Sequence, residues 1–177
     1  MSTRRFTVVI ALVLGASLAF AQSPNLGKPI SPADIAGWDI NVLPDGSGLP
    51  PGGGTPAEGS RVYAAKCSAC HGPEGKGGIN GRLVGGEPIK TIEGEKTIAN
   101  FWPYATTIFD YIRRAMPPKA AGSLKPDQVY SLTAFLLAKN GIIAQNAVMD
   151  ATTLPAVVMP ARNRFVPDDR NGGAKVR

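Results

Sequence analysis

The sequence predicts an all-α domain with an irregular arm at each end, and three observations support this. Helix signals occur in three segments, which begin near Thr55, Thr107 and Pro126. Between the first two segments, residues 72–100 lack strong periodicity and hold eight glycines. The region before the helices is rich in proline and glycine, and the region after them is largely non-periodic. A long irregular loop is hard to stabilise in a small domain unless it wraps a large rigid ligand.

The first two helices have clear boundary signals. Residues 55–58, Thr-Pro-Ala-Glu, form a capping box with proline at the first helical position. The first helix should therefore run from here through Tyr63 into the cysteines. The second helix is indicated by residues 107–110 and should continue to about Ala115, because two prolines follow at 117 and 118.

The third helix should begin at Pro126 and end at Asn140, where Gly141 suits a left-handed cap. Lys125 occupies the position where a capping hydroxyl would be better, and Asp127 in the first turn partly compensates. The apolar residues recur at the i, i+3, i+4, i+7, i+8 spacing of a one-sided helix. The residues on this stripe are Val129, Leu132, Thr133, Leu136 and Leu137.

Residues 1–21 have the features of a secretory signal peptide. Arg4 and Arg5 form a basic start, residues 6–20 are almost wholly apolar, and residues 19–21, Ala-Phe-Ala, offer a small-residue cleavage site. An uncleaved membrane anchor is the alternative, but a spanning helix needs about 20 apolar residues and this run is shorter. We therefore expect a periplasmic protein with no membrane anchor after cleavage.

The mature chain should divide into three parts. Residues 22–54 form a Pro/Gly-rich arm, residues 55–141 form the helical domain, and residues 142–177 form a second arm with a basic tail. The formal net charge of +6 includes Arg4 and Arg5, so the mature chain carries about +4. This mild excess favours encounters with acidic protein surfaces. Basic runs interleaved with aromatic residues are absent from the sequence, so nucleic acid is not an expected partner.

A C-x-x-C-H motif, Cys-Ser-Ala-Cys-His, follows the first helix at residues 67–71. This spacing marks attachment of heme c. Two thiols one helical turn apart can reach the two vinyl groups of one porphyrin, and the adjacent histidine then lies beneath the iron. The single motif predicts one covalently bound heme c, attached through Cys67 and Cys70, with His71 as an iron ligand.

Three other uses of the cysteines fit the sequence less well. A thioredoxin-like site would need a βαβ setting, which the sequence pattern does not show. A structural zinc site needs about four Cys or His ligands, and the chain has two cysteines and one histidine. A plain disulfide would leave the histidine and the glycine-rich loop unexplained.

The second iron ligand must come from another residue type, since His71 is the only histidine. Methionine is a common partner and raises the reduction potential. Met116 and Met159 are both followed by proline, so the local motif does not choose between them. Met116 lies between the second and third helices, where a proline-stiffened loop can fold over the open heme face. We expect Met116 to be the ligand and Met149 and Met159 to fill the core.

The helical domain resembles class I cytochrome c from Thr55 to Gly141. The features that carry the resemblance are the capped first helix with Gly59 and Tyr63, residues 67–72, the loop Leu83-Val84-Gly85, Met116-Pro117 and residues 130–137. The resemblance implies three main helices around one heme, with Gly59 letting the first helix cross closely against the last near Phe135. It also implies a loop carbonyl that orients the histidine. The family often has a proline there, and the matching residue here is Gly81.

Segments beyond a minimal cytochrome domain match a narrower group. These segments are residues 38–40, 43–46, 48–52, 102–104, 109–117 and 165–168. Together they resemble the cytochrome subunit of periplasmic molybdenum sulfite and sulfane-sulfur dehydrogenases across nearly the whole mature chain. The resemblance implies a molybdopterin-containing dehydrogenase subunit as electron donor. A downstream cytochrome or oxidase would then be the acceptor.

Several polar and aromatic residues are further candidates for contact with the heme. Arg82, Trp102 and Tyr104 could donate hydrogen bonds to the heme propionates, or Trp102 could belong to the core and Arg82 to the surface. Arg113 and Arg114 could face a partner or a propionate, or lie on a solvated helix face.

The sequence thus predicts a mono-heme electron-transfer cytochrome. No constellation of catalytic acid, base and nucleophile occurs in it, so the chain alone is not expected to oxidise sulfite. One alternative is a free periplasmic shuttle that serves other donors. Another is a heme sensor or catalyst with an open distal site, against which Met116 argues.

Overall fold

The structure is a computed structural model that describes residues 26–91 and 93–166. The predicted signal peptide and the end of the basic tail lie outside these residues. The chain separates into two units, one ending at Asp39 and the other beginning at Ile40. Among the described residues, none of the helices combines the length and apolar character needed to cross a bilayer.

In the part of the first unit that the structure describes, one short helix is present, α2 (Pro32–Ala36). Ser31 caps it reciprocally. Its hydroxyl accepts a hydrogen bond from the Asp34 N–H at 3.3 Å, and the Asp34 carboxylate accepts one from the Ser31 N–H at 2.8 Å. The sequence signal, a capping serine followed by proline, is therefore expressed as one turn of helix.

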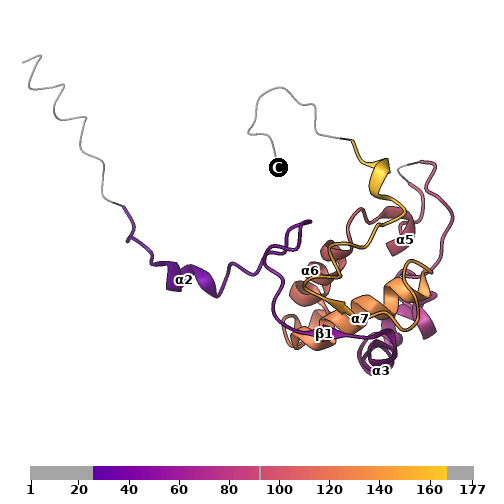
Figure 1. Ribbon diagram of the computed structural model, residues 1–177, viewed down its shortest axis with the longest axis horizontal. Helices are drawn as coiled ribbons and strands as arrows, with labels where there is room; N and C mark the ends of the chain where they lie inside the picture. The colour runs from indigo at the N-terminus through magenta and orange to yellow at the C-terminus, as the bar shows by residue number, and fades with distance from the viewer. Residues whose placement is uncertain (1–25, 92, 167–177) are drawn as a thin grey trace, which may run out of the picture. The chain divides into compact units, whose positions relative to one another are not determined.

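The second unit holds the remaining elements (Figure 1). In chain order they are β1 (Gly53–Gly54), α3 (Pro56–Lys66), α4 (Ser68–His71), η1 (Pro73–Gly75), α5 (Ile98–Phe101), α6 (Ala105–Ala115), η2 (Pro118–Ala120), α7 (Pro126–Lys139), β2 (Met149–Asp150) and η3 (Arg162–Arg164), where η marks a 3₁₀ helix. The three longest of the described helices, α3, α6 and α7, are those that the sequence predicts in the domain. Helix α6 begins two residues earlier than expected, where Ala105 and Thr106 are buried. The predicted all-α class is confirmed.

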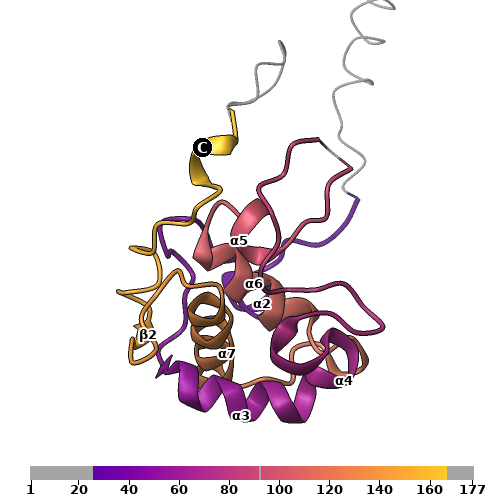
Figure 2. The same cartoon turned by 90° about the vertical axis from the view of Figure 1, so that its right-hand side faces the viewer.

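Helices α3 and α7 pack against each other (Figure 2), and Gly59 of α3 lies at their closest approach. A Cβ atom added at Gly59 would lie 1.9 Å from the Ser131 carbonyl oxygen and 2.7 Å from the Phe135 Cβ. No side chain larger than hydrogen fits at this contact. The close crossing that the family resemblance implies is therefore present, near Phe135 as expected.

The core lies between α3, α6 and α7. Phe109 of α6 and Tyr130 of α7 are fully buried, with ring centroids 4.5 Å apart. Every residue of α7 from Val129 to Ala138 is buried, although only one stripe was expected to be. The difference arises because α7 is also covered by segments before α3 and after α7.

These covering segments come from both arms. The Val42 N–H donates to the buried Asp110 carboxylate at 3.2 Å, and the Tyr130 hydroxyl donates to the Pro50 carbonyl at 2.8 Å. Strands β1 and β2 pair antiparallel, so the end of the first arm meets the second arm. The second arm also contributes core residues, namely Met149, Leu154, Met159 and Ala161.

Candidate functional site

The C-x-x-C-H segment forms a single helical turn directly after α3. The N–H groups of Cys70 and His71 both donate to the Cys67 carbonyl, at 3.1 and 3.0 Å. This turn is α4, and Cys67 is the residue where α3 ends and α4 begins. Both thiols are free and partly exposed, as covalent attachment to a ligand requires. The predicted one-turn separation of the two thiols is thus present.

Residues 72–85 wrap back over this turn. The buried Tyr63 hydroxyl donates to the Gly72 carbonyl at 3.0 Å. Gly72 has φ +75°, and a Cβ there would lie 1.9 Å from the Gly77 carbonyl oxygen. Glycine is therefore required where the chain leaves α4, because a side chain would clash with the returning loop.

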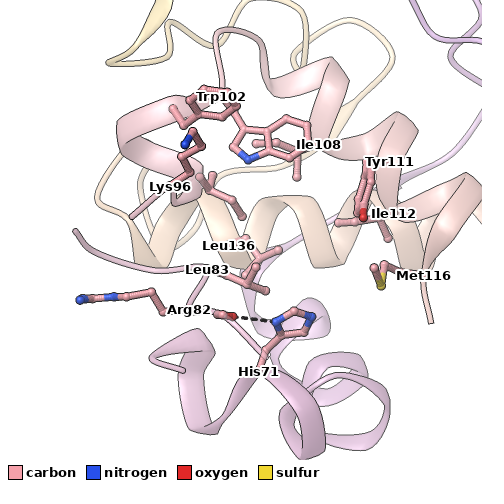
Figure 3. A pocket seen from close by; sticks show the side chains of 13 residues that line it. His71, Arg82, Leu83, Lys96, Trp102, Ile108, Tyr111, Ile112, Met116 and Leu136 are labelled. Carbon is pink, nitrogen blue, oxygen red and sulfur yellow. Dashed lines mark hydrogen bonds between the residues drawn. The ribbon is translucent and has the colours of Figure 1, made fainter. Parts of the chain in front are cut away.

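Near its end, at Gly81, this loop contacts His71. The imidazole Nδ1 lies 2.9 Å from the Gly81 carbonyl oxygen (Figure 3). A carbonyl can only accept, so Nδ1 carries the proton and donates. Nε2 of the neutral ring is then left with a free lone pair, which is the form that ligates a metal. The carbonyl that the resemblance assigns to orienting the histidine is in position here.

Met116 enters the site from the end of α6. Its N–H still bonds to the Ile112 carbonyl at 3.1 Å, but its backbone is extended, with φ −119° and ψ 144°. The following Pro117 and Pro118 prevent the helix from continuing. The side chain is half-buried and borders the same space as His71 (Figure 3).

An apolar cavity with two lobes is bordered by both His71 and Met116. The thiol lobe, about 450 Å³, has Cys67, Cys70 and Tyr63 in its wall. The aromatic lobe, about 410 Å³, has Trp102 and Tyr111 in its wall. Both lobes share five lining residues, which makes them parts of one site. The shared residues are His71, Leu83, Ile112, Met116 and Leu136.

The residues present fit a heme. Each lobe lies within the roughly 300–1,000 Å³ of ordinary ligand sites. The thiol lobe places two thiols beside an imidazole, and a thioether borders the same cavity. Leu83, Leu136 and Ile112 supply the apolar wall that a porphyrin face needs. Sulfur and imidazole ligands of this kind suit iron in a macrocycle.

The aromatic lobe is the more polar end of the cavity. Arg82 and Lys96 border it, and Figure 3 shows the Trp102 indole nitrogen turned toward the cavity. The Arg82 guanidinium is directed away from His71, where it lies 3.5 Å from the Glu95 carboxylate. Such donors and cations suit the carboxylates at one edge of a heme.

Tyr104, also expected near the propionates, is not among the residues that line either lobe. Its ring instead lies 4.6 Å from the Arg162 guanidinium carbon of the second arm. Arg114 pairs with Asp110 one turn earlier, and Arg113 donates to the Ile40 carbonyl at 3.3 Å. These two arginines therefore contribute to packing of the first arm and α6.

The buried Tyr63 phenol and the partly exposed Cys67 thiol in the wall are held in their neutral forms. Burial raises the pKa of Cys67 to about 11. Burial, and then the neighbouring Cys67, raise the pKa of Tyr63 to about 12. At neutral pH the thiol lobe therefore carries no charge from these two groups, as suits the apolar edge of a porphyrin.

Sequence reasoning missed two residues at the aromatic lobe. Tyr111 is 47% exposed, lines the lobe and stacks edge-on against Trp102, with ring centroids 5.7 Å apart. Lys96 lines the same lobe from the segment before α5. The periodicity of α6 could have indicated Tyr111, which lies one helical turn from Ile108. No local signal marks Lys96, since a long loop brings it there.

The fold and the cavity define a helical protein in which two thiols, an imidazole and a thioether border one apolar site. Residues 54–136 match the family model described as cytochrome c oxidase, cbb3-type, subunit III. The solved structures include a similar one, the crystal structure of the sulfane dehydrogenase SoxCD from Paracoccus pantotrophus. The two chains are 39% identical and superpose with a TM-score of 0.76. The match covers 84% of this chain and 74% of the chain in that structure. No curated protein matches.

This chain belongs to the class I c-type cytochromes. The predicted fold and the predicted resemblance to a sulfur-compound dehydrogenase subunit are both confirmed. A cytochrome c domain implies heme c as cofactor and electron transfer as function.

Proposed function

We propose that this chain is a periplasmic mono-heme cytochrome that takes electrons from a molybdenum sulfite or sulfur-compound dehydrogenase subunit. It passes them on to another cytochrome or an oxidase. The observation that carries the proposal is the shared cavity, where two free thiols, an imidazole and a thioether border one apolar space. The similarity to the sulfane dehydrogenase SoxCD supports the choice of partner.

Each residue of the site has a distinct role in this proposal. Cys67 and Cys70 form the two thioether links, and His71 and Met116 ligate the iron. Heme bound in this way supplies reversible one-electron exchange. The protein excludes water with Leu83, Leu136 and Ile112 and holds the His71 and Met116 side chains in place, so that little rearrangement would accompany a change of charge.

The covalent link is tested by mass. The mature protein should carry one porphyrin that survives denaturation, seen as a mass increment and as heme c absorption in alkaline pyridine. The double variant Cys67→Ala, Cys70→Ala should lose it, whereas Ser68→Ala in the same turn should keep it. A colourless wild-type protein from a host with c-type maturation would exclude the heme proposal.

The donor is tested by rapid mixing. The oxidised cytochrome should be reduced by sulfite or a sulfane compound only when the molybdenum subunit is present, and the two proteins should co-purify. Reduction by ascorbate serves as a control for an intact heme.

Rapid reduction without a stable complex would favour the free shuttle. Fast carbon monoxide binding to the reduced form would favour an open distal site.

Localisation is tested at the N-terminus. Cleavage after residues 19–21 predicts a mature protein that begins at Gln22 and is recovered from the periplasmic fraction. N-terminal sequencing of the purified protein checks both points, and retention of Met1 would contradict them.

A further inference from the structure

The end of α7 contacts the loop that orients His71. Helix α7 ends at Lys139, and Asn140 follows as its C-cap. The side-chain oxygen of Asn140 accepts a hydrogen bond from the Gly85 N–H at 2.9 Å. Its side-chain nitrogen donates to the Leu83 carbonyl at 3.4 Å and to the Leu136 carbonyl at 2.8 Å. One amide therefore links the helix to two points of the loop.

This amide is not needed merely to end the helix. Backbone groups already serve the last carbonyls, because Gly141 N–H donates to the Ala138 carbonyl and Ile142 N–H to the Leu137 carbonyl, both at 3.0 Å. Gly141 has φ +68°, the left-handed conformation that closes a helix. The contacts of Asn140 to Gly85 and Leu83 are thus additional to the cap.

The loop needs such an anchor because Gly81 itself makes few contacts that would hold its carbonyl in place. Gly81 is exposed, and among the described residues nothing lies within 4 Å of where its Cβ would be. The position of its carbonyl must be set by the residues on either side. On one side the Asn80 N–H donates to the Cys70 carbonyl at 2.9 Å. On the other side the Arg82 Nε donates to the Val84 carbonyl at 3.3 Å, and the Leu83 N–H donates to the Gly75 carbonyl at 2.8 Å. The Leu83 carbonyl is the point at which Asn140 reaches this side of the loop.

Leu83 and Gly85 are also hydrogen-bonded to the residues at the start of α5. The Thr97 hydroxyl donates to the Gly85 carbonyl at 2.5 Å, and the Ile98 N–H donates to the Leu83 carbonyl at 3.2 Å. Asn140 therefore completes a clamp in which the start of α5 and the end of α7 hold the same short segment. Removing one side of such a clamp leaves the segment ordered but free to shift.

We propose that Asn140 is a positioning residue, which holds Leu83–Gly85 so that the Gly81 carbonyl keeps its hydrogen bond to His71 Nδ1. That hydrogen bond fixes the plane of the imidazole and raises the electron density on Nε2. A more basic imidazole stabilises oxidised iron more than reduced iron. Asn140 thereby lowers the reduction potential without touching the heme ligands. The inference rests on the heme site proposed above.

The test compares two amide side chains at the same helix end. Gln145 donates to the Ala138 carbonyl at 3.2 Å, and no hydrogen bond links it to the loop among the contacts of the described residues. Asn140→Ala should raise the reduction potential and change the hyperfine-shifted heme methyl resonances of the oxidised protein. Gln145→Ala should alter neither. Both variants can lower thermal stability, so stability alone does not separate a positioning role from a structural one.

Amide exchange of the Gly85 N–H gives a second readout. In the wild type the Gly85 N–H should exchange slowly, and in Asn140→Ala about two- to tenfold faster, which is the factor that the loss of one hydrogen bond produces. Asn140→Ser, which keeps a polar cap but is too short to reach Gly85, should behave like the alanine variant and replaces it if that variant does not mature.

The inference is overturned if the Asn140 variants keep the wild-type potential and methyl resonances, or if the wild-type Gly85 N–H exchanges freely. These measurements use electrochemistry and NMR alone. A wrong electron donor would leave them unchanged, whereas a missing heme would be apparent from a colourless sample.

Discussion

Met116 and Met159 share a following proline but differ in their surroundings. Met116 is half-buried and borders both lobes of the cavity. Met159 is 1% exposed and belongs to the core that the second arm completes. The burial of Met159 agrees with the sequence expectation that it fills space. The assignment of Met116 as an iron ligand stays a prediction, which the positions of both residues support.

Replacement of each methionine tests the assignment. Met116→Ala should abolish the weak near-infrared sulfur-to-iron band of the oxidised protein, because the thioether is lost. Met159→Leu should keep the band and cost less than about 1.5 kcal/mol of stability, since the volume is nearly conserved. Absorption spectroscopy of both oxidised variants checks this. Loss of the band in the Met159 variant alone would reverse the assignment.

Individual residues of the site differ in how far the sequence could predict them. Cys67, Cys70 and His71 follow from covalent chemistry, because their spacing has few other uses. Gly81 followed from the resemblance to the family, in which the matching loop position supplies the carbonyl. Tyr111 and Lys96 were missed because they reach the aromatic lobe through the packing of α6 and the path of a long loop. Tyr104 was expected there from its aromatic character, which says nothing of direction.

At the scale of helices, the α3–α7 crossing depends on the absence of a single side chain. Gly59→Ala should lower the free energy of unfolding by about 2 kcal/mol or more, because the new Cβ would meet the Ser131 backbone, which cannot move aside cheaply. The exposed neighbour Ser60→Ala should stay within about 0.5 kcal/mol of wild type. Urea unfolding of the heme proteins measures both. Equal stability of the two variants would contradict the close crossing.

An ion pair also joins α7 to the loop that follows the C-x-x-C-H motif. The Glu74 carboxylate pairs with Lys139 and, at 3.2 Å, with Lys76. The hydrogen bond from Lys139, then that from Lys76 and their charges, lower the pKa of Glu74 below 4.5. A carboxyl whose pKa is lowered by folding stabilises the protein above its unfolded value and loses that effect as the pH falls through its folded value.

Glu74→Gln should therefore lower the melting temperature at pH 7 but not in acid. The difference from wild type should be constant above about pH 5 and should shrink as the pH falls below about 4.3, where an unfolded glutamate titrates. Lys139→Gln should reproduce part of this pattern. Melting curves between pH 2 and 7 give the comparison. A difference that persisted at pH 2 would mean that packing, and not charge, is responsible.

The elements that the sequence predicted were those with local boundary signals. The capping box at Thr55 and the proline stop after Met116 fix where α3 begins and where α6 ends. The short helix α5 was missed, since four residues cannot show periodicity. The β1–β2 pairing was missed because it joins residues 53–54 to residues 149–150. Pairings so distant in sequence leave no mark in either segment alone.

At the scale of the whole molecule, both arms contribute to the fold. Their proline and glycine content predicted irregular segments on both sides of residues 55–141 but did not indicate whether these segments pack on the domain. In the structure, residues 40–54 and 142–166 cover α7 and close the core. Residues before Ile40 form a separate unit. The irregular segments pack because α7 presents apolar side chains on every face, and a helix buried all round needs cover from outside the three-helix set.

Two truncations of the mature chain measure this difference. A variant that begins at Ile40 should mature with heme and keep its melting temperature, because the removed residues belong to the other unit.

A variant that begins at Thr55 should be several kcal/mol less stable. It loses the buried Val42, worth about 1.5–3 kcal/mol. It also leaves the buried Asp110 carboxylate and the Tyr130 hydroxyl without the Val42 and Pro50 partners, at about 1 kcal/mol or more each. Thermal melts of both variants, matched for heme content, decide the question. If the Thr55 variant melts with the Ile40 variant, the segment from Ile40 to Gly54 lies on the domain without stabilising it.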